Sequence, residues 1–84
     1  MFYVYAIQSI KDDRIYVGMT SDIVKRIKQH NSGLTFSTRP FIPWQLIYSE
    51  QLPDRDTARK REKYLKSGVG KEFLKSIATA KSKQ

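Results

Sequence analysis

The sequence contains no cysteine, few acidic residues and no long hydrophobic run. Without cysteine the chain has neither disulfides nor thiolate metal sites, which fits a reducing compartment. No apolar run approaches the roughly 18–20 residues that a membrane-spanning helix needs. Met1 leads directly into strand-like sequence rather than into a signal peptide. We therefore expect a cytoplasmic protein with no membrane partner.

The length of 84 residues limits the chain to one small domain. A chain of this size buries only roughly 60–65% of the surface that its unfolded form exposes, so its core is thin. We place the domain at residues 1–79 and expect a flexible tail over residues 80–84.

The charge is strongly positive, because sixteen lysines and arginines face eight aspartates and glutamates, for a net charge of +8. Such an excess favours a polyanionic partner, nucleic acid first and an anionic membrane second. No helix combines a basic face with a broad face of Trp, Phe and Leu, which argues against a membrane-surface role. The alternative is a basic domain with no polyanionic partner.

Two short strands are predicted at the start of the chain, Phe2–Ser9 and Arg14–Thr20, joined by a polar turn. Both are rich in the aromatic and β-branched residues that favour strands. Side chains alternate along a strand, so an even-numbered loop would place Tyr5 and Tyr16 on the same face, as opposite or diagonal neighbours. Gly18 would leave a hollow beside them for a ligand or another backbone segment.

A helix is predicted from about Ile23 to Asn31, capped by Ser21 or Asp22 and ended by Gly33. Arg26 and His30 lie four residues apart, so they are neighbours on one helical face, close to the tyrosine hairpin. They are candidate site residues. The alternatives are a surface arginine whose aliphatic stem covers apolar area and a buried histidine with satisfied hydrogen bonds.

A loop over residues 33–43 carries hydroxyls, Arg39 and aromatic residues, a combination that can contact phosphates and bases. A third strand follows over residues 44–50. Strict alternation would place Trp44, Leu46 and Tyr48 on one of its faces and Ile47 on the other.

A second helix is predicted from Asp54 or Asp56 to about Ser67, and a third from Gly70 onward. The inward stripe of the second helix comprises Ala58, Glu62, Leu65 and Val69. A carboxylate on an inward stripe requires a partner, either an arginine that fixes helix packing or a metal ion.

These segments together resemble the GIY-YIG nuclease superfamily, particularly its small stand-alone bacterial members. The two signatures read Val4-Tyr5-Ala6 and Tyr16-Val17-Gly18, and the likeness continues over residues 22–33, 39–40, 43–48 and 61–68. The resemblance implies an α+β fold with a small three-stranded antiparallel sheet flanked by about three helices. Larger members carry an asparagine after the glutamate, a position that has no counterpart here.

The resemblance also implies metal-dependent cleavage of phosphodiester bonds. It assigns the signature tyrosines to Tyr5 and Tyr16, the catalytic arginine to Arg26, a supporting histidine to His30 and the metal-binding glutamate to Glu62. Glu62 would hold one Mg²⁺ or Mn²⁺ ion. We expect Tyr5 to activate the attacking water and Tyr16 to orient the phosphate, although the sequence does not separate these two roles. A catalytic Tyr5 would need a lowered pKa or a proton relay.

Basic side chains would contact the phosphates without reading the base sequence. The predicted contacts are Lys25, Arg39, Arg59, Lys63, Lys66 and Lys71. The sequence thus predicts a DNA endonuclease with little sequence preference, of a kind that serves repair or recombination. The alternatives are a non-catalytic nucleic-acid-binding module and a nuclease subunit that is active only with a protein partner.

Overall fold

The structure is a computed structural model that describes residues 1–82, and it has the predicted α+β fold. In chain order the elements are β1 (Phe2–Ser9), β2 (Ile15–Thr20), α1 (Ile23–Asn31), the short 3-10 helix η1 (Arg39–Phe41), β3 (Trp44–Leu52), α2 (Arg55–Lys66) and α3 (Gly68–Ser82). The strands form one antiparallel sheet in the order β2-β1-β3. The predicted three-stranded sheet and three helices are therefore confirmed.

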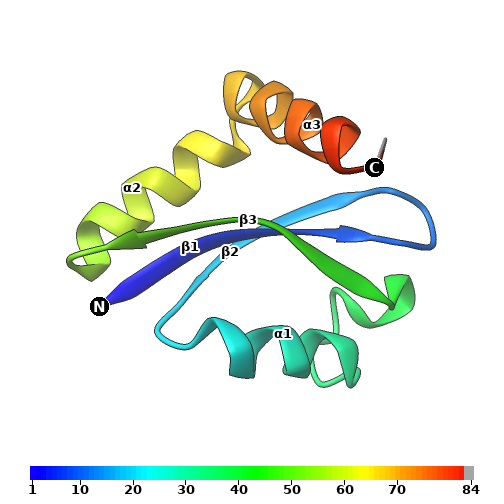
Figure 1. Cartoon of the computed structure of the whole chain (residues 1–84). Helices are drawn as coiled ribbons and strands as arrows, with labels where there is room; N and C mark the ends of the chain where they lie inside the picture. The colour runs from blue at the N-terminus through cyan, green and yellow to red at the C-terminus, as the bar shows by residue number, and fades with distance from the viewer. Residues whose placement is uncertain (83–84) are drawn as a thin grey trace.

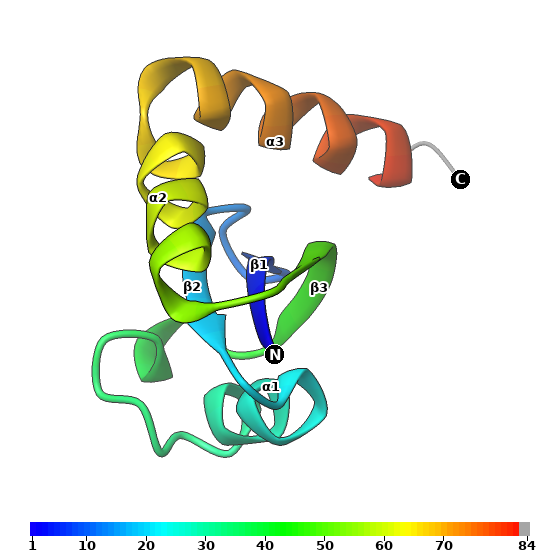
Figure 2. The ribbon, with the colours of Figure 1, turned by 90° about the vertical axis from the view of Figure 1, so that its left-hand side faces the viewer.

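Helices cover both faces of the sheet, with α1 on one face and α2 and α3 on the other (Figure 1). The core between the sheet and the α2–α3 layer is built on Val4, Ala6, Val17, Ile47, Ala58, Leu65, Leu74 and Ala78. The core toward α1 is smaller and contains Tyr5, Ile7 and Trp44. A view from the side shows β2 as the edge strand, with α2 above it and α1 below (Figure 2).

The register of β1 and β2 confirms the predicted pairing of the two tyrosines. Tyr5 lies opposite Gly18, and Ile7 lies opposite Tyr16. Tyr5 and Tyr16 are thus diagonal neighbours on the face that packs against α1.

Strand β3 departs from strict alternation. Its pairing with β1 shifts between Ala6, which faces Tyr48, and Ile7, which faces Leu46. The extra residue, Ile47, forms a bulge, and both Ile47 and Tyr48 pack against the core on the α2–α3 side. Trp44 packs in the other core, so the prediction that Trp44 and Tyr48 share a face is wrong.

Local sequence signals set the ends of the helices. The Asp22 carboxylate accepts a hydrogen bond from the backbone of Lys25 at the start of α1. Gly33, with a φ of 84°, follows the C-terminal end of α1 in the left-handed conformation that glycine adopts readily. Asp54 caps α2 in the same way through the backbone N–H of Thr57. The predicted range of α1, Ile23–Asn31, is confirmed.

The boundary between α2 and α3 differs from the prediction. Helix α2 ends at Lys66 and α3 begins at Gly68, two residues earlier than expected. Val69 therefore lies in the first turn of α3 and is 68% exposed, so its placement on the inward stripe of α2 is wrong. The stripe does not continue across the break between the two helices. Helix α3 runs to Ser82, whereas a tail was expected from Ala80; residues 83–84 lie outside the described part of the chain.

Candidate active site

Tyr5 lies at the centre of the candidate site, on the middle strand of the sheet, and is only 1% exposed. Its ring occupies the space that a side chain at position 18 would take. A Cβ atom added to Gly18 would lie 2.6 Å from the Tyr5 hydroxyl oxygen and 2.8 Å from Cζ. The hollow predicted beside Gly18 is thus filled by Tyr5 itself rather than by a ligand.

A chain of hydrogen bonds leads from the Tyr5 hydroxyl into the loop after α1. The hydroxyl lies 2.8 Å from Nε2 of His30, and Nδ1 of His30 lies 2.8 Å from Oγ1 of Thr38. Both His30 and Thr38 are buried. The backbone carbonyl of Thr38 accepts a hydrogen bond from the indole N–H of Trp44, which anchors this loop to β3.

The donor and acceptor of each hydrogen bond in this series can be assigned by starting from Thr38. The Thr38 hydroxyl donates to the carbonyl of Thr35 at 3.4 Å, so its oxygen accepts from His30 Nδ1–H. A neutral imidazole has one N–H, which leaves Nε2 of His30 to accept from the hydroxyl of Tyr5. The Tyr5 oxygen accepts in turn from Nε of Arg26 at 3.4 Å.

The directions in which the pKa values of His30 and Tyr5 are shifted agree with both side chains being neutral. Burial, aided by the charge of Arg26, lowers the pKa of His30 to about 4. Burial raises the pKa of Tyr5, against a hydrogen bond and a charge interaction with Arg26 that lower it. Of the two routes by which Tyr5 could act as a base, a lowered pKa is not found, because burial outweighs the nearby cation, and the proton relay is the route that is left.

Arg26 lies half-buried on α1, and its charge has no carboxylate partner among the residues that the structure describes. It donates hydrogen bonds to Tyr5 and, at 3.1 Å, to the side-chain oxygen of Gln29. Within residues 1–82 no carboxylate lies within ion-pairing distance of Arg26. A half-buried cation that lacks a counterion is suited to binding an anion such as phosphate.

Tyr16 is the more accessible of the two signature tyrosines. Its ring packs edge-on against His30, with centroids 5.2 Å apart, and against Trp44 at 6.4 Å. Its hydroxyl makes no hydrogen bond with any other residue in the described part of the chain, and Tyr16 lines a surface groove. The Tyr16 hydroxyl is thus available to a bound molecule, whereas that of Tyr5 is already engaged.

Glu62 comes from α2, which packs against the opposite face of the sheet and reaches the site beside the edge strand β2 (Figure 2). The charges of Tyr16 and Glu62 both add to the rise in the pKa of Tyr5, which places Glu62 within electrostatic range of the phenol. The Glu62 side chain is 20% exposed and pairs with Lys66 at 3.5 Å. Direct contacts therefore link Tyr5, Tyr16, Arg26 and His30, and an electrostatic interaction links Glu62 to them.

The donor set fits a hard divalent cation only in part. Residues 1–82 contain no group of three or more His, Cys, Asp or Glu side chains able to hold a metal ion. Mg²⁺ commonly keeps several waters and binds one or two carboxylates together with substrate phosphates. The half-buried carboxylate of Glu62 fits such an ion when a phosphate completes the ligand set.

The predicted phosphate contacts do not lie on one surface. All six side chains are exposed, but Lys25 and Arg39 belong to the α1 side of the sheet, and Arg39 lies over the ring of Phe36 at 5.3 Å. The remaining four are on the α2–α3 side: Arg59, Lys63, Lys66 and Lys71.

Two polar residues have roles that sequence reasoning did not assign. Thr38 belongs to the loop whose hydroxyls were expected to contact phosphates and bases, yet it is buried and holds His30. The chain's sole asparagine, Asn31, donates to the backbone carbonyl of Trp44 at 3.0 Å and accepts from its N–H at 2.7 Å. Asn31 therefore fixes α1 to β3 and does not replace the asparagine of the larger relatives.

Comparison with known proteins agrees with this geometry, since the GIY-YIG catalytic domain matches residues 1–75. The chain belongs to the GIY-YIG family. The UPF0213 protein CPE1444 of Clostridium perfringens is 35% identical, covering 100% of this chain and 90% of that protein. The UPF0213 protein SSP2268 of Staphylococcus saprophyticus is 36% identical, over 90% of this chain and 93% of that protein.

A solved structure shares the GIY-YIG fold seen here. The solution NMR structure of the UPF0213 protein BH0048 from Bacillus halodurans is 36% identical, with a TM-score of 0.54, over 92% of this chain and 85% of that one. The chain is thus one of the small GIY-YIG family proteins and has a nuclease-type fold. Over residues 1–82, no helix has the length and apolar character required to cross a membrane.

Proposed function

We propose that this protein is a metal-dependent endonuclease that hydrolyses phosphodiester bonds in nucleic acid, DNA in the first place. The observation that carries the proposal is the position of Arg26. Its guanidinium has no carboxylate partner within residues 1–82, is hydrogen-bonded to Tyr5 and lies in the cluster that contains Tyr16. Membership of the GIY-YIG family supports the reaction type.

The contacts favour a division of labour between the two tyrosines. The hydroxyl of Tyr5 is buried and donates to His30, and its pKa is raised, so Tyr5 is suited to holding Arg26 and His30 in place. The hydroxyl of Tyr16 is unengaged among the described residues, so Tyr16 is suited to facing the attacking water. Tyr16 thereby takes the role first expected for Tyr5, and Tyr5 becomes a positioning residue.

In the proposed reaction, Arg26 binds the non-bridging oxygens of the phosphate through its planar guanidinium. Tyr16, in its phenolate form, takes a proton from the attacking water. The water oxygen then bonds to phosphorus, and the bond between phosphorus and the leaving oxygen breaks with its electron pair on that oxygen. The leaving oxygen takes a proton from solvent, and Tyr16 returns its proton to solvent. Glu62 would hold one Mg²⁺ or Mn²⁺ ion, which supplies positive charge at the phosphate when bound.

The test is cleavage of end-labelled DNA and RNA by purified protein with Mn²⁺ or Mg²⁺. Tyr16→Phe should reduce the rate by about 100-fold or more, the range expected when a proton-transfer group is removed. Tyr64→Phe is the matched control, because Tyr64 is 43% exposed on α2 and lies outside the cluster. Cleavage by Tyr16→Phe at the rate of the parent protein would exclude this role for Tyr16.

A second candidate function is nucleic-acid binding without cleavage. The ion pair between Glu62 and Lys66 favours it, because it neutralises the only carboxylate proposed to bind the metal ion. Retention of labelled DNA by purified protein, with no cleavage under any metal condition, would support this alternative. Activity that appears only with a co-purifying subunit would support a partner-dependent nuclease.

A further inference from the structure

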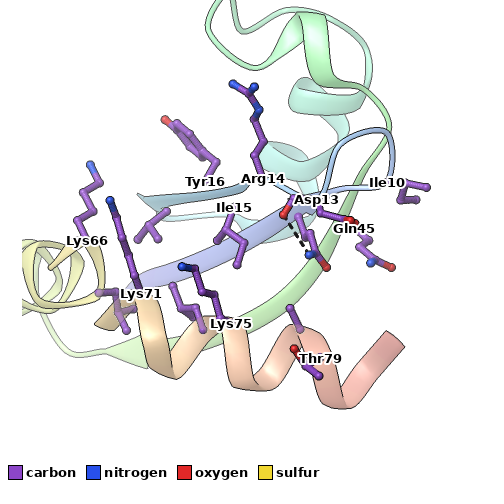
Figure 3. A pocket seen from close by; sticks show the side chains of 15 residues that line it. Ile10, Asp13, Arg14, Ile15, Tyr16, Gln45, Lys66, Lys71, Lys75 and Thr79 are labelled. Atoms are coloured by element: carbon purple, nitrogen blue, oxygen red, sulfur yellow. Dashed lines mark hydrogen bonds between the residues drawn. The ribbon is translucent and has the colours of Figure 1, made fainter. Parts of the chain in front are cut away.

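A groove runs between α3 and the β1–β2 hairpin, beginning beside Tyr16 (Figure 3). Its volume is about 990 Å³. It lies on the α2–α3 side of the sheet, whereas Arg26 and His30 lie on the α1 side. Tyr16, on the edge strand β2, contacts His30 in the candidate active site and also lines the groove. The groove therefore continues outward from the candidate active site.

The lining of the groove combines an apolar floor with a cationic rim. The floor that is open to a ligand is formed by Ile10, which is 58% exposed, and by the half-buried Ile15. The other apolar residues in the lining belong to the buried core, namely Val17, Leu65, Leu74 and Ala78. The cations are Arg14 on the hairpin, Lys66 at the end of α2, and Lys71 and Lys75 on α3. The acidic residue in the lining is Asp13, at the turn of the hairpin. Lys66 and Lys71 extend at the end nearest Tyr16, and Lys75 reaches across toward Ile15 (Figure 3).

The cations on α3 have little internal neutralisation. Lys71 makes no ion pair within residues 1–82. Lys75 lies 3.7 Å from Glu72, but both side chains are more than 60% exposed, so this pair contributes little. The α3 side of the groove therefore offers two positive charges to an incoming anion.

The pattern of charge and apolar surface distinguishes unpaired from paired strands. A duplex directs its phosphates outward and keeps its base faces stacked, so it would contact the rim and leave the floor empty. An unpaired strand exposes base faces that pack on apolar side chains while its phosphates follow a positively charged groove. The floor and rim are complementary to such a strand in both respects.

We propose that this groove binds the unpaired nucleotides that continue from the phosphate at Tyr16, so that single strands and single-stranded branches are the preferred ligands. This inference rests on the proposed function, because it is the proposed function that places a phosphate beside Tyr16. Lys71 and Lys75 then hold backbone phosphates, and Ile10 and Ile15 contact bases.

The binding test uses the whole protein with EDTA, so that cleavage does not interfere. Fluorescence anisotropy is measured with a labelled twelve-nucleotide oligo(dT) and with a blunt twelve-base-pair duplex at several salt concentrations. We expect the single strand to bind at least about tenfold more tightly than the duplex, since the duplex reaches only the rim. Equal affinities, or tighter binding of the duplex, would overturn the inference.

Paired charge reversals test the α3 side of the groove. Lys71→Glu combined with Lys75→Glu should lower the slope of log affinity against log salt for oligo(dT) by about 1.4, the value for two lost phosphate contacts on a single strand. Lys28→Glu combined with Lys60→Glu is the matched control, because both lysines are exposed and neither lines the groove. Equal effects of the two double variants would mean that binding depends on overall charge alone, and would contradict the proposed site.

NMR spectroscopy tests the floor without any substitution. Addition of oligo(dT) should shift the backbone amide signals of Ile10 and Ile15 in a ¹⁵N-labelled sample. Shifts confined to residues outside the groove would overturn the inference. Selective single-strand binding without cleavage under any metal condition would leave the groove assigned and refute the proposed function. Cleavage without a preference for single strands would support the proposed function and refute the assignment of the groove.

Discussion

The close packing of Gly18 against Tyr5 makes Gly18→Ala a sharp test of how the site is built. The added methyl group would lie 2.6 Å from the Tyr5 hydroxyl oxygen and 2.8 Å from Cζ. Both distances are shorter than those at which a Cβ atom normally approaches a non-bonded atom. Tyr5 cannot turn away freely, because its ring is buried and its hydroxyl is bonded to His30 at 2.8 Å. The strain must instead move β2 or break this hydrogen bond.

Overpacking of this kind typically costs about 1–3 kcal/mol of folding free energy. A loss of about 2 kcal/mol in a chain of this length lowers the melting temperature by roughly 8–16 °C. Thermal unfolding followed by circular dichroism measures the shift, and the imidazole NMR signals of His30 report the broken hydrogen bond.

Gly68→Ala is the matched control for this substitution. No atom lies within 4 Å of a Cβ added there, and the position is in the first turn of α3. We expect it to leave stability unchanged or to raise it by up to about 1 kcal/mol, since alanine favours helix more than glycine does. An unchanged melting temperature for Gly18→Ala would refute the claim that Tyr5 fills the space beside the glycine.

Two further predictions concern the hydrogen-bond chain behind Tyr5. His30 has its pKa lowered from 6.5 to about 4, so the unfolded chain binds a proton more readily and stability should fall by about 3 kcal/mol as the pH drops from 6.5 to 4. Urea unfolding at several pH values measures this slope, and His30→Gln should flatten it; an equal slope in both proteins would assign the pH dependence to other groups. Thr38→Val should cost about 1–3 kcal/mol, because it leaves Nδ1–H of His30 buried without an acceptor. Ser37→Ala, an exposed neighbour, is its control in the same unfolding assay, and an equally small effect of both changes would contradict the assigned hydrogen bond.

The features that could be predicted from the sequence are those set by local signals. Alternation along two short strands placed Tyr5 and Tyr16 on one face once an even-numbered loop was assumed between them. Asp22 and Gly33 defined α1, because a capping carboxylate and a glycine in the left-handed conformation act within one helical turn. The family motifs then indicated the remaining candidates.

The features that could not be predicted depend on contacts between distant segments. The bulge at Ile47 inserts one residue into a regular pattern, and alternation carries no information about where that happens. Thr38 resembles a surface hydroxyl in sequence, and only the packing of its loop against His30 shows that it is buried. The raised pKa of Tyr5 is likewise a consequence of burial, which outweighs the influence of Arg26.

The proposed metal-dependent cleavage requires Glu62 to act together with the tyrosine and arginine cluster. Its most direct test compares the cleavage rates of Glu62→Gln and the parent protein on a labelled single-stranded oligonucleotide with Mn²⁺. Glu72→Gln is the control, because Glu72 is exposed on α3 and has no contact with the cluster. We expect Glu62→Gln to abolish cleavage and Glu72→Gln to preserve it, whereas undiminished cleavage by Glu62→Gln would contradict the account.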